Sequence, residues 1–137
     1  MIVLDTSFLV GLYNLHDAHR QAAWATQPDF ASGSWGDGVL LEYVFLETMS
    51  VLLQRAGLSH AVAIGNLLRN SKEILFVPCS KLCQKAWEGF AEQASTRLSL
   101  TDIAVAQFAI EHADGRVLSF DREMAKVPGV RLLPITI

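Results

Sequence analysis

Two aspartates stand directly after apolar runs, where side chains with a chemical role are often found. Asp5 follows Ile2-Val3-Leu4, and Asp121 follows Val117-Leu118-Ser119-Phe120. If both runs are parallel strands, both acids lie at the carboxyl edge of one sheet, which is where open parallel sheets bind ligands. Each aspartate taken singly could instead cap the helix or turn that follows it. Two strands ending in the same way favour a shared site.

Two further acids fall on expected helices. On a helix over 42–55, Glu47 has mostly apolar neighbours on its own face, so we expect it to point inward. A buried carboxylate costs several kcal/mol unless it is paired or bound to a metal. Glu42 begins the same helix and is predicted to be an exposed charge that suits the helix dipole. Ser99 and Asp102 have the spacing of a capping box, yet that helix start could also aim Asp102 at the other acids.

Four carboxylates gathered in one cleft repel one another and raise one another's pKa values. A divalent cation removes this conflict, and Mg²⁺ or Mn²⁺ prefers carboxylate oxygens while keeping several waters. Such an ion can activate water and stabilise the charge on a phosphodiester under in-line attack. The four acids, Asp5, Glu47, Asp102 and Asp121, therefore predict a site for metal-assisted phosphodiester hydrolysis.

Composition narrows the class of protein. The chain has 137 residues, of which 51% are hydrophobic and 18% charged, so we expect one compact domain over residues 1–137. A net charge of -3 excludes a protein that coats nucleic acid through bulk charge. Without the four candidate acids, 14 − 4 = 10 acids remain against 11 bases, so a polyanionic substrate stays possible.

The sequence also indicates a compartment. Asp5 interrupts the apolar N-terminus and the first basic residue is Arg20, so a signal peptide is not expected. No uncharged apolar run is long enough to span a membrane. Cys79 and Cys83 are too few for a zinc site or a disulfide framework. We expect reduced thiols in a cytoplasmic protein without a membrane segment.

Short apolar runs alternate with helical stretches along the whole chain. The strands are continuous apolar runs, which is typical of a parallel sheet covered on both faces, and the fold class predicted is a three-layer α/β/α sandwich. Strands are expected at 2–4, 39–41, 74–77, 116–120 and 130–133. Helices are expected at 8–13, 18–26, 42–55, 59–70, 80–94, 101–112 and 122–126, with a loop over 27–38.

An ordered set of short motifs resembles the PIN domain, and most closely the VapC-type toxin ribonucleases. The resemblance covers essentially the whole chain. The motifs are Ile2-Val3-Leu4-Asp5-Thr6-Ser7, His16-Asp17-Ala18-His19, Tyr43-Val44-Phe45-Leu46-Glu47, Leu100-Thr101-Asp102, Leu118-Ser119-Phe120-Asp121-Arg122 and Pro128-Gly129-Val130-Arg131-Leu132-Leu133-Pro134.

The resemblance implies Mg²⁺- or Mn²⁺-dependent RNA cleavage that leaves 5′-phosphate and 3′-hydroxyl ends. It also implies a homodimer and an antitoxin partner that inserts a peptide near the site. The family's metal ligands carry over onto the four acids, and Thr6 and Ser119 match positions whose hydroxyls support them. The chain departs from the family at Leu40 and Leu41, where polar residues often precede the helix that carries the glutamate.

Three other functions are compared with this one: a non-catalytic PIN domain, a phosphatase and a receiver domain. A degenerate PIN domain could bind RNA or protein without cutting it. A phosphatase of the haloacid-dehalogenase type needs a second aspartate where Ser7 stands, and a receiver domain needs a lysine that Lys126 is poorly placed to supply.

Some further residues could contact RNA or a metal. His16 and His19 are expected to be structural or superficial, because a metal site would need a third ligand. Trp87, beside Phe90, is predicted to pack in the core, whereas Trp35 could contact a base or a partner. Arg122 adjoins Asp121 and is the favoured phosphate contact. Other basic residues are expected to be mostly solvated: Arg20, Arg55, Lys81, Lys85 and Arg97.

Overall fold

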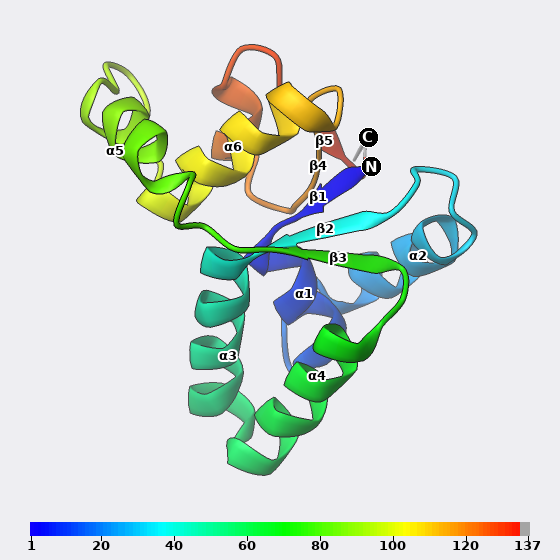
Figure 1. The fold of residues 1–137 in the computed structure, drawn as a ribbon. Coiled ribbons are helices and arrows are strands. Elements are labelled where there is room, and N and C mark those ends of the chain that lie inside the picture. Colours follow the sequence, from blue (N-terminus) through cyan, green and yellow to red (C-terminus); the bar gives the residue numbers. More distant parts are fainter. Residues whose placement is uncertain (135–137) are drawn as a thin grey trace.

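The computed structural model describes residues 1–134, which form a five-stranded, all-parallel sheet flanked by helices (Figure 1). The strand order is β3-β2-β1-β4-β5, so the two strands that end near Asp5 and Asp121 are neighbours. The strands are β1 (Ile2–Leu4), β2 (Gly38–Leu41), β3 (Ile74–Val77), β4 (Arg116–Leu118) and β5 (Arg131–Leu133).

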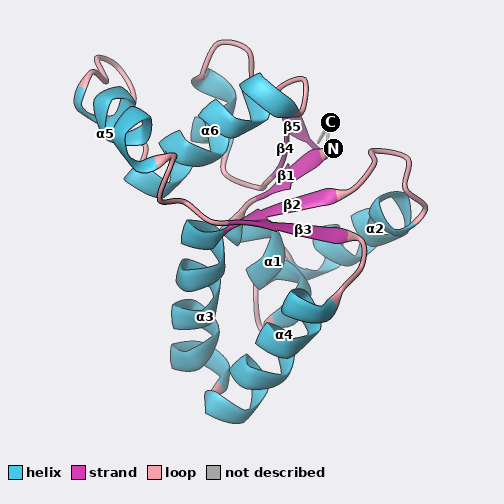
Figure 2. Cartoon of the chain, in the orientation of Figure 1, coloured by secondary structure: helices cyan, strands magenta, loops and turns pink. Residues whose placement is uncertain are grey.

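Helices cover both faces of the sheet, as Figures 1 and 2 show, and this confirms the predicted three-layer α/β/α fold. Four helices lie on one face and two on the other, with a 3₁₀ turn before β5. The first group is α1 (Thr6–Tyr13), α2 (Arg20–Ala31), α3 (Glu42–Ala56) and α4 (Leu58–Asn70). The second is α5 (Cys83–Ala91) and α6 (Leu100–His112), and the 3₁₀ turn is η1 (Arg122–Lys126).

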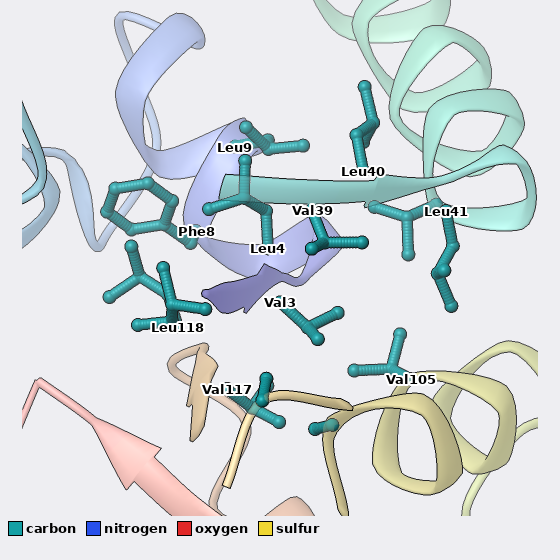
Figure 3. Packing of buried hydrophobic residues seen from close by; sticks show 14 of the residues in the cluster. Val3, Leu4, Phe8, Leu9, Val39, Leu40, Leu41, Val105, Val117 and Leu118 are labelled. Carbon is teal, nitrogen blue, oxygen red and sulfur yellow. The ribbon is translucent and has the colours of Figure 1, made fainter. Parts of the chain in front are cut away.

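The core lies on both sides of the sheet. Val3 pairs with Val39 on one side and Val117 on the other, and all three are fully buried. Val105 of α6 packs against this cluster, while Phe8 packs from α1 on the opposite face (Figure 3). Burial on both faces explains why the strands are continuous apolar runs, and each fully buried aliphatic side chain stabilises the fold by about 1.5–3 kcal/mol.

The carboxyl edge of the sheet is where several helices begin. In Figure 1 this edge lies on the left, where α3 leaves β2 and where α6 starts. α1 begins immediately after Asp5, two residues earlier than predicted, and α3 begins immediately after Leu41. Leu41 provides no side-chain cap, so Glu42 starts the helix unassisted by the polar residues that the family often has there.

The predicted loop over 27–38 is partly wrong, because α2 continues through Pro28 to Ala31. Proline removes one backbone donor from a helix and usually ends it. Here the helix continues because Phe30 packs against the core, and the Ser32 amide still donates to the Pro28 carbonyl at 2.9 Å. The turn comes instead at Gly33, whose φ of 77° suits glycine.

Two predicted helix starts are also wrong. α4 begins at Leu58, directly after Gly57 (φ 90°), so Ser59 lies inside the helix and caps nothing. α5 begins at Cys83 rather than Ser80, because residues 79–82 form a turn in which the Leu82 amide donates to the Cys79 carbonyl at 3.0 Å.

Trp87 is not in the core as predicted, because 54% of it is exposed. α5 packs on α6 through its small residues instead. Ala86 is fully buried, and a side chain at Gly89 would collide with Gln107 and Ile103 of α6. The close approach of the two helices therefore leaves the Trp87 ring on the outer face.

Two further predictions concern the extent of the chain. None of the helices in residues 1–134 is long and apolar enough to cross a membrane. One domain over 1–137 stays a prediction, and residues 135–137 lie outside the described residues.

Candidate metal and catalytic site

The end of β1 is joined to the end of β4 by hydrogen bonds around Asp5. The Asp5 amide donates to the Leu118 carbonyl at 3.0 Å, and the Ser119 hydroxyl donates to Asp5 Oδ2 at 2.5 Å. Asp5 also accepts from the Thr6 amide at the start of α1. Only 3% of the residue is exposed, so this carboxylate is held rigidly at the base of the site.

Ser7 completes this junction, and the sequence reasoning gave it no role at the site. Its Oγ accepts from the Phe120 amide at 2.9 Å and lies 3.0 Å from Ser119 Oγ. Ser119 uses its one proton on Asp5, so Ser7 is the donor between the two hydroxyls. The Asp121 amide also donates to Ser119 Oγ at 3.0 Å. The signal in the sequence is a hydroxyl residue two positions after the strand-ending acid.

Asp102 and Asp121 both act in helix caps, and both also line the pocket described below. Asp102 completes a capping box with Ser99: its carboxylate accepts from the Ser99 amide at 3.1 Å, and Ser99 Oγ accepts from the Asp102 amide at 3.1 Å. Asp121 caps η1 by accepting from the Glu123 amide at 3.0 Å. Capping therefore fixes these two carboxylates where α6 and η1 begin.

A pocket of about 380 Å³ at this edge of the sheet brings the four predicted acids together. Its remaining lining comes from α1, the segment before α2, α3 and the residue that caps α6. The lining residues are Asp5, Thr6, Ser7, Val10, Asp17, His19, Glu47, Val51, Arg55, Ser99, Asp102 and Asp121. A larger pocket of about 680 Å³ lies between α2, α4 and β3, but among the described residues Glu73 is the one carboxylate that lines it, so the smaller pocket is the candidate site.

Glu47 reaches the pocket in a different way from the one predicted. The buried positions of α3 are Val44, Thr48 and Leu52, whereas Glu47 stands on the neighbouring stripe and is exposed to the pocket. Glu42 is not the freely exposed charge that was expected. It is half-buried, and its Oε1 accepts from the Cys79 amide at 2.9 Å, which fixes the turn after β3.

The acids of the pocket perturb one another. Burial raises the pKa of Asp5 to about 7, the Ser119 and Thr6 hydrogen bonds oppose the increase, and the charges of Asp102 and Asp121 add to it. Burial, then Asp102, raises the pKa of Glu47, and the nearby Thr6 hydroxyl opposes this. Burial likewise raises the pKa of Asp102, with a smaller contribution from Asp121. Without a cation, the ionised forms of these three carboxylates are therefore disfavoured.

The donor set suits a hard divalent cation that keeps part of its water shell. In residues 1–134, no three His, Cys, Asp or Glu side chains are close enough together to hold an ion directly. Mg²⁺ commonly takes only one or two carboxylates and bridges to others through water. The buried Thr6 hydroxyl also has no hydrogen-bond partner in the described part of the chain, although it lines the pocket. Carboxylates with raised pKa values around the Thr6 hydroxyl fit such an ion.

Other predicted residues are placed as follows. Arg122 is exposed and is not among the residues that line the pocket, whereas Arg55 is. The His19 ring stacks on Phe120 with centroids 4.7 Å apart, which is a structural role, and His19 also lines the pocket. Trp35 is half-buried against the core.

The chain is similar to known proteins in sequence and in fold. The family model of the PIN domain matches residues 2–130. Among solved structures, VapC20 of Mycobacterium tuberculosis, described as a toxin that cleaves the sarcin-ricin loop, superposes with a TM-score of 0.78. It is 25% identical, and the match covers 95% of this chain and 97% of that one. No curated protein sequence gives a significant match. With the family model spanning almost the whole chain, over β1 to β4 and all four acids, the protein belongs to the PIN domain family.

Proposed function

We propose that this protein is a metal-dependent endoribonuclease that acts as the toxin of a toxin–antitoxin pair. The observation that carries the proposal is the convergence of Asp5, Glu47, Asp102 and Asp121 on one pocket at the carboxyl edge of the sheet. Membership of the PIN family and the similarity to VapC20, a ribonucleolytic toxin by its description, support RNA as the substrate.

The four carboxylates would hold Mg²⁺ or Mn²⁺, which supplies an activated water and stabilises charge on the phosphate when bound. The chain's own contribution is positioning. Ser119 and the Thr6 amide hold Asp5, and the capping bonds hold Asp102 and Asp121. The Thr6 hydroxyl lies near Glu47, whose pKa it lowers, and Thr6 lines the same pocket. No side-chain nucleophile is needed for this reaction.

The proposal includes partners and a compartment. A toxin of this type works on cytoplasmic RNA and is kept inactive by a cognate antitoxin that inserts a peptide near the acidic pocket. We also expect the protein to be a homodimer, as the resemblance implies. Sedimentation of the purified chain, with and without the co-expressed antitoxin, tests both associations.

The decisive test compares Asp5→Asn and Glu47→Gln with the wild type in an RNA cleavage assay with Mg²⁺ or Mn²⁺. Suitable substrates are an unstructured RNA and a hairpin that carries the sarcin-ricin loop. We expect each variant to lose at least about 100-fold in rate, because transition-state charge stabilisation of this kind is typically worth several kcal/mol. Asp29→Asn is the matched control, since Asp29 is exposed and does not line the pocket.

Full activity in EDTA would contradict the metal-dependent mechanism. The competing hypothesis is a degenerate PIN domain that binds RNA or protein without cutting it. Calorimetry separates the two, because a functional nuclease site should bind Mn²⁺ and lose that binding in Glu47→Gln. RNA binding without Mn²⁺ binding or cleavage would favour the degenerate module.

A further inference from the structure

The acidic pocket is the middle of three adjoining hollows. It shares Arg55 with a second pocket of about 300 Å³, which is lined by residues after α1 and near the α3–α4 turn. It shares Glu47 and Ser99 with a third pocket of about 500 Å³ between α3 and the start of α6. Because they share lining residues, the three hollows adjoin one another with the acids in the middle one, and we call them together the trough.

One wall of the trough is helix α3. Glu47, Val51 and Arg55 recur every fourth residue, and all three line the acidic pocket. Eight residues of helix separate Glu47 from Arg55, which is roughly 12 Å along the axis. Arg55 therefore stands at the boundary between the acidic pocket and the second pocket rather than at the acids themselves.

The charge of Arg55 is held in place and yet remains available. Its guanidinium pairs with Asp17 Oδ1 at 3.6 Å, and 58% of the Arg55 side chain is exposed. Asp17 is itself fixed, because its Oδ2 accepts from the His19 amide at 2.9 Å. The pair is long and its arginine end is mostly exposed to solvent, although only 12% of the Asp17 side chain is, so screening at the arginine end weakens the pair and a phosphate can compete for the guanidinium. Arginine also matches phosphate oxygens with two parallel donors.

We propose that a single RNA strand lies along this trough and that Arg55 binds the backbone phosphate that flanks the scissile one on the side of the second pocket. Arg55 is thus a positioning residue for the nuclease proposed above, and this inference rests on that function. The acids with a bound cation and the Arg55 guanidinium both suit phosphate groups. A polyanion whose charges repeat along its length can place one phosphate at the acids with their cation and the next at Arg55.

The test is RNA binding as a function of salt concentration. Fluorescence anisotropy with a dye-labelled 12-nucleotide single-stranded RNA, in Ca²⁺ to occupy the acids, gives the dependence of log Kd on log salt. Each lost phosphate contact lowers this slope by about 0.7 for a single strand. We expect Arg55→Gln to lower the slope by about that amount and Arg55→Lys to restore it. In cleavage assays, Arg55→Gln should raise KM and leave kcat nearly unchanged.

Two controls isolate the phosphate contact. Asp17→Asn breaks the same ion pair but keeps the guanidinium, so its salt slope should stay at the wild-type value. Arg69→Gln removes the same charge from an exposed position that lines none of the three hollows, and it should change nothing. A wild-type slope in Arg55→Gln, or an equal loss in Arg69→Gln, would overturn the role of Arg55 and leave the nuclease proposal intact. Failure of the wild-type protein to bind RNA at all would overturn both.

Discussion

At the scale of single residues, Asp5 is under two opposing demands. The fold buries it at the junction of β1 and β4, which raises its pKa to about 7, whereas a metal site needs the ionised form. In the absence of metal, Asp5 therefore stays protonated to a higher pH than an exposed aspartate does. The pKa values of Glu47 and Asp102 are raised in the same direction.

This predicts that the metal-free protein becomes less stable as the pH rises. Because the pKa of Asp5 in the folded state lies above its ordinary value of 3.8, its contribution to stability is fully present below about pH 4 and is lost as the pH rises through about 7. Asp5→Asn cannot ionise, so relative to the wild type it should gain stability on the order of a few kcal/mol between these pH values. Urea unfolding in EDTA across that range measures the difference. A difference that stays constant with pH would contradict the buried position of Asp5.

Glu47 shows what the sequence could and could not predict for a single residue. Its helix and its role as a site candidate follow from the spacing, but its environment does not. Thr48 is fully buried, although it is a polar residue, and so the inward stripe of α3 runs through Val44, Thr48 and Leu52. A helical pattern read from hydrophobicity alone shifts the inward face by one position.

At the scale of elements, the start of α6 places Asp102. The capping box joins Ser99 and Asp102 in both directions, so the same bonds that begin the helix also orient the carboxylate. We predict that Ser99→Ala lowers the free energy of unfolding by about 1 kcal/mol. It should also reduce cleavage. The Asp102 amide loses the Ser99 hydroxyl that accepts from it, and this loosens the turn that orients the Asp102 carboxylate.

Ser99→Thr is the matched variant, since threonine keeps the hydroxyl that accepts from the Asp102 amide. It should retain most of the stability and most of the activity. Chemical denaturation and the cleavage assay, applied to both variants, separate the two effects. Equal activity in Ser99→Ala and the wild type would show that the cap does not orient the acid.

Elements differ in how well the sequence predicts them. All five strands were found because burial on both faces makes them continuous apolar runs, although β4 ends at Leu118, before the predicted Phe120. The ends of α2 and the start of α5 were missed because tertiary contacts decide them. Phe30 against the core carries α2 past Pro28, and Glu42 fixes the turn before α5 from a distant part of the chain.

At the scale of the whole molecule, cation binding at the proposed site would couple to folding. Asp5 follows β1, Glu47 and Asp102 lie in α3 and α6, and Asp121 precedes η1. An ion held between these acids would therefore link parts of the chain that are far apart in sequence. We predict that Mn²⁺ at 100 times its Kd stabilises the fold by about 2.7 kcal/mol. A thermal melt should show a rise in Tm of several degrees, and a much smaller rise in Glu47→Gln. An equal rise in both proteins would place the ion elsewhere.

The two jobs of the capping acids have a consequence for the history of such a protein. Asp5 and Asp121 are the N-caps of helical segments, and Asp102 completes the capping box of α6. Selection for folding alone would therefore tend to preserve all three, even in a descendant that had stopped cutting RNA. Glu47 lies in the second turn of α3 and caps no helix, so folding alone does not constrain it in this way. A lineage that abandons the reaction should therefore lose this glutamate first and keep its aspartates, because the aspartates still stabilise the fold.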